Sequence, residues 1–404
     1  MQRRHLLRAG AATAALPLLA RSPRAAADPI VVGDLNSYSA LPAFTRPYRK
    51  GWKLALAEIN DAGGVLGRPI EVISRDDGGE PGAAVTVANE LIRRHGASLL
   101  MGTLLSNVGL AVSDTAAQRG SLFLAAEPLT DALAWSQATP YTFRLRPGTY
   151  VQAAMLAERA AELDATRWAV VAPNYEYGQS AVTAFKELLR ARRPDVEFVA
   201  EQWPPLFGID AGAVTQAVAS AQPEAIFNVT FSTDLVKFAR EGQLRGLFDG
   251  RAVVSMLTGE PEWMAPLGTD LPTGWIVTGY PWDTLDTEAH ARFRDAYRAR
   301  FDEHPYMGSV VGYTALHTLA AAIGQAGEPG ADAVAEQMRG LSVDSPFGGI
   351  RFRTVDQQST MGTFVGTTAV KHGRGALVDW TYNAGEAYLP PRDEAAARRA
   401  GEGR

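Results

Sequence analysis

The chain of 404 residues contains no cysteine. This absence excludes disulfide bonds, thiolate metal sites, cysteine nucleophiles and an acylated N-terminal cysteine. Stability and chemistry must therefore come from other side chains. A chain of this length can bury a sizeable core, and two domains are the expected number.

Motifs of common enzymes and cofactor sites are also missing. The sequence has no P-loop, no HExxH, no nucleophile elbow and no spaced G-x-G-x-x-G. Its six histidines form no i, i+4 pair. The net charge of -5 is mild and provides no basic surface for nucleic acid. We therefore expect a protein that is not an enzyme and that uses no cofactor, metal or nucleic acid.

Residues 1–27 have the form of an export signal. MQRRHLLRAG carries the twin arginine Arg3–Arg4, the apolar run AATAALPLLA follows, and Ala25–Ala27 supply the small residues before a cleavage point. We expect the mature chain to begin at Asp28 and to be soluble in the periplasm. The twin arginine favours export of the folded protein, with the general secretory route as the alternative. No later run is expected to span a membrane.

After the leader, short apolar runs alternate with longer amphipathic ones, and the series occurs twice. The expected strands of the first series are residues 29–35, 70–76, 98–103 and 122–126. Those of the second are residues 167–174, 196–203, 225–231, 252–257 and 274–280. Helical patterns lie between them, which indicates βαβ units and mostly parallel sheets. We expect an α/β protein with two Rossmann-like lobes.

The last third of the chain has a different pattern. Residues 288–305 and 308–327 are expected to form two consecutive helices, followed by short strands over 349–360, 366–373 and 376–383. A chain that ends in this way is expected to cross back between the lobes. Residues 391–404 are charged and have little to bury, so we expect a disordered tail there.

The strand-to-helix loops have the character of a binding site, because ligands of α/β proteins lie beyond the carboxyl ends of the strands. Ser106 follows one expected strand and precedes a helix, where it could hold a carboxylate or act as a plain N-cap. Thr130 has a similar position and the same two roles. Tyr177 and Phe231 lie at other loop tips, with Tyr175 nearby. These aromatic rings could line a ligand or pack against the facing lobe.

Several segments together resemble the solute-binding proteins of branched-chain amino-acid ABC transporters, which have the type I periplasmic-binding-protein fold. They are INDAGGVLGRPIEVISRDD, GTLLSNVGLAVSD, NYEYGQS and GSVVGYTALHTLAAAI, and they occur in the family's order. The resemblance implies a Venus-flytrap architecture in which three crossovers form a hinge near Arg146, Tyr280 and Gly349. It assigns 28–146 with 281–348 to lobe I, and 147–280 with 349–390 to lobe II.

The resemblance also implies roles for individual residues. Ser106 and Thr130 match the positions that hold a ligand carboxylate, and Glu260 falls near the acid that pairs with the ligand ammonium. The loop Ala126–Thr130 departs from the family's usual Ser-Pro-Ala-Ala-Thr, which changes the expected backbone contacts there. If Glu260 is misplaced, Glu127 and Asp131 are the alternative acids.

Aromatic and loop positions complete the expected site. The family's aromatic residues match Tyr177, Phe231 and Phe44, with Tyr38 near the last of these, and Pro128 lies in the departing loop. We therefore expect the monomeric binding component of an ABC importer that delivers an amino acid, or a related carboxylate or amide, to a membrane permease. A sensory receptor of the same fold is the alternative, and an amide hydrolase on this scaffold is a further one.

Overall fold

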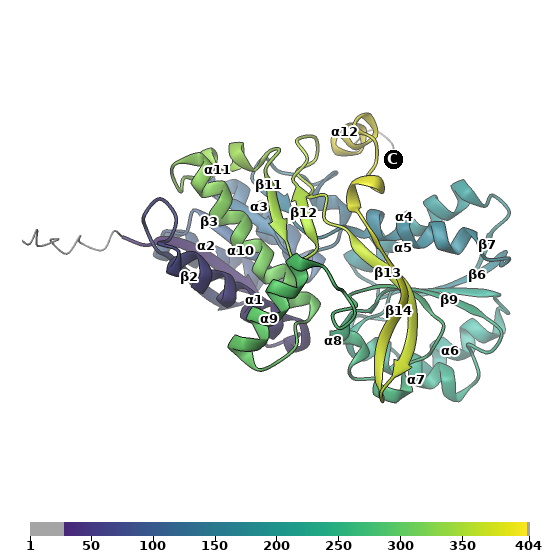
Figure 1. The fold of residues 1–404 in the computed structure, drawn as a ribbon. Coiled ribbons are helices and arrows are strands. Elements are labelled where there is room, and N and C mark those ends of the chain that lie inside the picture. Colours follow the sequence, from purple (N-terminus) through teal and green to yellow (C-terminus); the bar gives the residue numbers. More distant parts are fainter. Residues whose placement is uncertain (1–27, 402–404) are drawn as a thin grey trace, which may run out of the picture.

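Two separate sheets organise the chain in the computed structural model, which describes residues 28–401 (Figure 1). The first sheet is parallel throughout, in the order β2-β1-β3-β4-β5. Its central strands are buried, as expected for parallel strands covered by helices on both faces. Its strands are β1 (Ile30–Asn36), β2 (Ile70–Asp76), β3 (Leu99–Gly102), β4 (Leu122–Ala125) and β5 (Thr142–Arg144).

The second sheet has the order β14-β13-β10-β9-β8-β6-β7. Five of its strands are parallel, and the last two of the chain add to one edge as an antiparallel pair. Its strands are β6 (Arg167–Val171), β7 (Glu197–Gln202), β8 (Ala225–Asn228), β9 (Ala252–Gly259), β10 (Ile276–Gly279), β13 (Thr363–Lys371) and β14 (Arg374–Asn383). The predicted α/β fold with two lobes is confirmed.

Helices cover each sheet and separate its strands. Those of lobe I are α1 (Pro42–Asp61), α2 (Pro81–His95), α3 (Ser106–Arg119), α9 (Glu288–Phe301), α10 (Met307–Ala326) and α11 (Ala331–Met338). Those of lobe II are α4 (Thr149–Ala161), α5 (Glu176–Arg192), α6 (Ala211–Ser220), α7 (Ser232–Leu244) and α8 (Pro261–Met264). Single 3₁₀ turns are η1 (Asp131–Leu133), η2 (Gly268–Asp270) and η3 (Gly385–Ala387).

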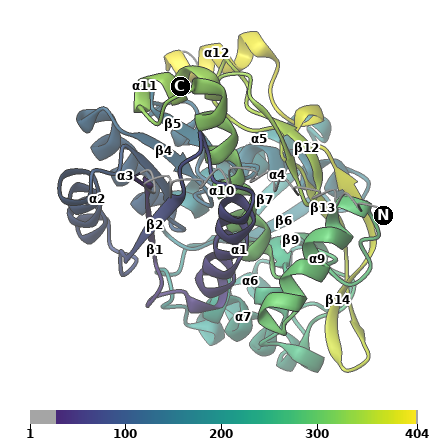
Figure 2. The same ribbon diagram turned by 60° about the vertical axis from the view of Figure 1, so that its left-hand side comes forward.

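Helix α10 comes late in the sequence but packs along α1 of the first βα unit, as both views show (Figure 2). The close approach requires glycine. A Cβ at Gly308 would lie 2.4 Å from the Phe44 carbonyl oxygen, and one at Gly312 would lie 2.1 Å from that of Tyr48. The GSVVG segment therefore fixes lobe I by bringing two helix backbones together.

The same helix is long and strongly apolar. By length and composition alone, α10 could cross a membrane. In the structure, 78% of its most apolar window is buried inside the molecule. Its apolar character is explained by the core of lobe I, where Val310, Ala315, Leu316 and Leu319 are fully buried.

The chain passes between the lobes three times, after β5, after β10 and after the two-stranded sheet of β11 (Ser342–Ser345) and β12 (Gly348–Arg351). Arg146 lies in the first connection and Tyr280 in the second. Gly349 lies inside β12, so the third connection comes later, at residues 352–362. The strand expected over 349–360 is therefore too long. After Arg351 the chain leaves β12, and Gln358 forms a bridge with Arg144 of the first connection.

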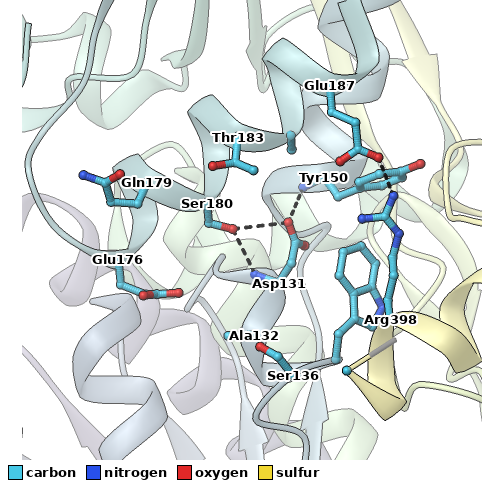
Figure 3. A pocket seen from close by; sticks show the side chains of 13 residues that line it. Asp131, Ala132, Ser136, Tyr150, Glu176, Gln179, Ser180, Thr183, Glu187 and Arg398 are labelled. Carbon is cyan, nitrogen blue, oxygen red and sulfur yellow. Dashed lines mark hydrogen bonds and ion pairs between the residues drawn. The ribbon is translucent and has the colours of Figure 1, made fainter. Parts of the chain in front are cut away.

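The expected disordered tail is wrong for most of its length, because α12 (Arg392–Ala400) is a regular helix that ends at Gly401. Arg398 makes ion pairs with Glu187 and Glu394, at 2.6 and 2.8 Å. Its guanidinium also lies over the rings of Trp135 and Tyr150, 5.1 and 4.8 Å from their centroids. Figure 3 shows Arg398 reaching toward Glu187 and Tyr150. This helix was not predicted from the sequence because its composition is polar, and because Glu187, Trp135 and Tyr150, which Arg398 contacts, are distant in the sequence.

We predict that Arg398→Ala lowers the free energy of unfolding by about 1 kcal/mol, since it removes two partly exposed ion pairs and two cation–π contacts. Denaturant unfolding measures this. Arg392→Ala is the matched control, because Arg392 lies on the same helix, is exposed, and has no ion pair within residues 28–401. Equal stability of the two variants would show that Arg398 does not hold α12 in place.

Candidate functional site

A cavity lies where the strand-to-helix loops of the two lobes meet. Its empty volume is about 300 Å³, and hydrogen bonds from Thr130 to Glu176 and from the start of α10 to Glu262 join the two lobes around it. Lobe I supplies side chains that follow β3 and β4, and lobe II supplies side chains that follow β6, β8 and β9. The lining residues are Leu104, Ser106, Glu127, Leu129, Tyr175, Tyr177, Phe231, Leu257 and Trp263.

The loop after β3 is shaped by its backbone. Gly102 has a φ of 123°, and a Cβ there would lie 2.2 Å from the Leu35 carbonyl oxygen, so only glycine fits. The next residue, Thr103, also has a positive φ, of 55°. This turn directs the chain away from the sheet, and α3 then begins at Ser106. The side chain of Ser106 consequently lies in the cavity wall.

Four aromatic rings from lobe II form most of one wall. The ring centroids of Tyr177 lie 6.0 Å from Tyr175 and 5.7 Å from Phe231. Phe231 in turn lies 5.7 Å from Trp263, with the two rings edge to face. Tyr175 and Phe231 are the N-cap residues of α5 and α7, which points them beyond the ends of β6 and β8. Offset and edge-to-face contacts of this kind keep the rings in a fixed arrangement.

Ser106 and Thr130 lie together but play different parts. The backbone N–H of Thr130 donates to Ser106 Oγ at 3.2 Å. The hydroxyl of Thr130 donates to Glu176 on α5 at 2.6 Å and accepts from Ala132 N at 3.2 Å. The donors of Thr130 are therefore used within the protein, and Thr130 does not line the cavity. The hydroxyl hydrogen of Ser106 remains available to a ligand.

Behind the cavity, one buried guanidinium joins acids from both lobes. Arg146, in the first connection, pairs with Glu127 of lobe I and with Glu260 of lobe II. None of the three side chains is more than 6% exposed. The second oxygen of Glu260 accepts from Trp263 Nε1 at 3.0 Å. The second oxygen of Glu127 is buried and has no hydrogen-bond partner in the described part of the chain.

A third buried acid, Glu262, lies on α8 of lobe II. Its two oxygens accept the backbone N–H groups of Met307 and Gly308, at 3.1 and 2.8 Å, at the start of α10 in lobe I. A carboxylate is favourable at a helix N-terminus, where N–H groups have no partner within the helix. This contact joins the two lobes.

Burial controls the ionisation of these acids. It raises the pKa of Glu127 well above its usual value and also raises that of Glu260, with Arg146 opposing both shifts. Burial and the nearby charge of Glu260 raise the pKa of Glu262 to about 8. The carboxylates hold the pKa of Arg146 above its usual value, so the guanidinium remains charged.

Three of the expected site residues therefore line the cavity, and the others do not. Phe44 stacks on Trp263 from the opposite lobe, with centroids 6.4 Å apart. The hydroxyl of Tyr38 donates to Asp34 at 2.6 Å. Pro128 packs so closely on Gly109 of α3 that a Cβ there would lie 2.5 Å from its Cγ. These residues, with Thr130 and Glu260, form the support behind the wall.

Sequence reasoning missed Trp263 and Arg146, and it named Glu127 only as an alternative. The position of Glu127 directly after β4 is a usable signal, because such positions face the cleft. Asp131, the other alternative acid, accepts from Arg144, Thr149, Ser180 and the Tyr150 N–H. Asp131 lines a different pocket, beside α12 (Figure 3). Because its carboxylate already has these partners, it is not available to a ligand in the cavity between the lobes.

Two α/β lobes that close over a cavity at their strand ends define a protein that encloses a small solute. The chain belongs to the periplasmic binding protein family, which matches residues 29–373. This is a family of binding proteins and not of enzymes.

Individual relatives are distant. The chain is 26% identical to the Leu/Ile/Val-binding protein BraC3 of Rhizobium johnstonii, over 83% of this chain and 90% of that one. It is 24% identical to the leucine-, isoleucine-, valine-, threonine- and alanine-binding protein of Pseudomonas aeruginosa, over 75% and 80%. A solute-binding protein of Rhodopseudomonas palustris BisB5, solved with 3,4-dihydroxybenzoic acid, aligns with a TM-score of 0.79 and 20% identity, over 88% and 97%.

We predict that Arg146→Met lowers the free energy of unfolding by about 3–5 kcal/mol, because Glu127 and Glu260 are left buried without a counter-charge. Denaturant unfolding at several pH values measures this. This loss of stability should grow as pH rises. Burial favours the protonated form of each acid in the folded state, so the stability that this form contributes at low pH is lost once the acid ionises.

A triple variant, Arg146→Met with Glu127→Gln and Glu260→Gln, provides the control. It removes the buried charges together, so it should recover much of the lost stability, and the additional pH dependence caused by Arg146→Met should disappear. A single variant within about 1 kcal/mol of the wild type at every pH would contradict the importance of the ion pairs.

Proposed function

We propose that this protein is the exported solute-binding component of an ABC importer, which encloses a small organic solute and delivers it to a membrane permease. The observation that carries this proposal is the cavity bounded by side chains of both lobes, because such a cavity can be filled or emptied only by moving one lobe. Family membership supports it. The predicted export signal, residues 1–27, lies outside the described residues.

The solute proposed first is an amino acid, or a related carboxylate or amide. The relatives from Rhizobium johnstonii and Pseudomonas aeruginosa are named for binding apolar amino acids. The aromatic wall and three leucine residues of the cavity suit an apolar body. Ser106 supplies a hydroxyl to the polar end. Since Glu260 is committed to Arg146, the free oxygen of Glu127 is the acceptor nearest to a ligand amine.

Closure is proposed as a rotation of lobe I (28–146 with 281–351) against lobe II (147–280 with 363–390) about the three connections, so that the boundary expected at residue 349 moves to the connection at 352–362. Contacts that cross the cleft form only in the closed state, so they determine how much free energy closure releases. Glu262 at the start of α10 is one such contact, and the bond from Thr130 to Glu176 is another.

We predict that Ser106→Ala weakens solute binding by about 0.5–1.5 kcal/mol if its partner is neutral, and by about 1.5–3 kcal/mol if the partner is a carboxylate. Isothermal titration with each solute found by thermal-shift screening measures this. Ser113→Ala is the control, because Ser113 lies on the same helix and bonds to Thr142, away from the cavity. Unchanged affinity in Ser106→Ala would remove Ser106 from the site.

We also predict that Glu262→Ala weakens binding of every solute by the same factor, about 1–2 kcal/mol in free energy, because the α10 N-terminus loses its partner only when the cleft is closed. Small-angle scattering should show compaction of the wild type at solute concentrations that leave the variant extended. Glu303→Ala is the control, because Glu303 pairs with Lys50 within lobe I. A solute that binds without any compaction would contradict the proposed closure.

A further inference from the structure

Glu127 is the feature of the cavity that the resemblance does not explain. It lies in the loop that departs from the family's usual Ser-Pro-Ala-Ala-Thr, lines the cavity, and is only 5% exposed. One oxygen pairs with Arg146, while Oε2 is buried and unpartnered within the described chain. Tyr177 Oη, on the same cavity wall, is likewise buried without a partner there. A buried polar atom without a hydrogen-bond partner costs free energy. A group in the cavity that bonds to both atoms would remove this cost.

Several donors near this cavity are already in use, and Arg146 Nε, which has no partner in the described chain, is buried behind the wall. The N–H of Thr130 goes to Ser106, and its hydroxyl goes to Glu176. Arg146 directs two of its nitrogens to Glu127 and Glu260, is 0% exposed, and does not line the cavity. An anionic group placed in the cavity would therefore find the hydroxyls of Ser106 and Tyr177 but no cation among the described lining residues, and it would face the carboxyl group of Glu127.

The buried acids beside the cavity, by contrast, have too little positive charge around them. The carboxyl groups of Glu127 and Glu260 share one guanidinium, whereas Glu262 bonds instead to backbone N–H groups. Burial raises the pKa of Tyr175 on the cavity wall, and the nearby Glu127 adds to that shift. A cation in the cavity would supply the missing positive charge at the one carboxylate oxygen that is free.

The surrounding rings suit the same kind of group. A cation is attracted to the face of an aromatic ring within about 6 Å of its centroid, and several rings around one ammonium form an aromatic cage. Tyr175, Tyr177, Phe231 and Trp263 each lie within 6.5 Å of another of the four. The cavity therefore combines an aromatic wall with one under-satisfied carboxylate.

We propose that the solute is an organic amine, whose ammonium group lies against the aromatic wall and pairs with Oε2 of Glu127, and that it needs no carboxylate for binding. This inference rests on the proposed function and narrows its solute class. Amino acids share the ammonium but bring a carboxylate for which the cavity offers only the neutral hydroxyls of Ser106 and Tyr177.

Matched probes test the proposal by isothermal titration. The aromatic series is tyramine, tyrosine and phloretate, and the branched series is isoamylamine, leucine and isocaproate. Within each series the amine should bind tightest, the amino acid more weakly and the acid weakest. The proposal is overturned if neither amine binds at millimolar concentration, or if in both series the amino acid or the acid binds more tightly than the amine.

Two variants locate the ammonium. Glu127→Gln should weaken binding of the amines about ten- to hundredfold, since it removes a charged hydrogen-bond partner, and binding of the acids should not weaken. Tyr175→Leu keeps an apolar wall but removes a π face, so it should weaken the amines about two- to thirtyfold and leave the acids unchanged. Glu71→Gln, a substitution of an exposed acid on β2, should change neither.

The outcomes separate this inference from the proposed function. Small-angle scattering is measured with each probe that binds. Compaction with an acid or an amino acid as the tightest probe overturns the amine proposal and leaves the solute-binding function standing. Amine binding without compaction, and unchanged by either variant, places the amine outside the cleft and overturns the proposal. If Glu127→Gln fails to fold, Tyr175→Leu decides, and equal loss for amines and acids overturns the proposal.

Discussion

The ion pairs of Arg146 with Glu127 and Glu260 are the constraint on which the closed cleft depends. A guanidinium and carboxylates lose several kcal/mol each when they leave water, so they are stable inside only while they remain together. Because Glu127 follows a strand of lobe I and Glu260 follows a strand of lobe II, keeping the charges together also keeps the two loops together. Arg146 lies in a connection between the lobes, so the cluster lies where rotation moves atoms least. The floor of the cavity is thereby fixed while its walls can separate.

A second arginine, Arg144, lies at the end of β5, next to the same connection. It holds the loops at the hinge together in a similar way. Arg144 donates to Gln358 of the third connection, to the carbonyl oxygens of Leu129 and Thr130, and to Asp131. The loop that carries Glu127 is therefore held at its far end by Arg144 and near its start by Arg146. Contacts farther from the hinge, such as Glu262 with α10, have to separate when the lobes rotate. Their strength sets the balance between open and closed states, whereas the two arginines preserve the geometry of the loop.

Much of the fold could be predicted from the sequence, because alternating apolar and amphipathic runs determine strands, helices and parallel sheets. The presence of Ser106, Tyr177 and Phe231 in the site could also be predicted, since residues directly after parallel strands face the cleft. Contacts between residues that are distant in the sequence could not be predicted. Nothing local to Glu260 indicates that its charge is used by Arg146, which lies 114 positions away. Helix α12 was missed for the same reason, because its sequence is polar and Arg398 finds its partner Glu187 only in the folded molecule.

The structural relatives show how little the fold itself says about the solute. A protein solved with an aromatic acid and this chain share most of their length, yet only 20% of aligned residues are identical, so the loops can differ freely. The sign of the charge in the cavity then decides between ligand classes, because a buried charge without a partner costs far more than a missing apolar contact. In this chain the positive charge of Arg146 lies behind the wall and is paired with two carboxyl groups, whereas Glu127 lines the cavity. A binding protein with the same lobes but an arginine at that position would be expected to prefer anions.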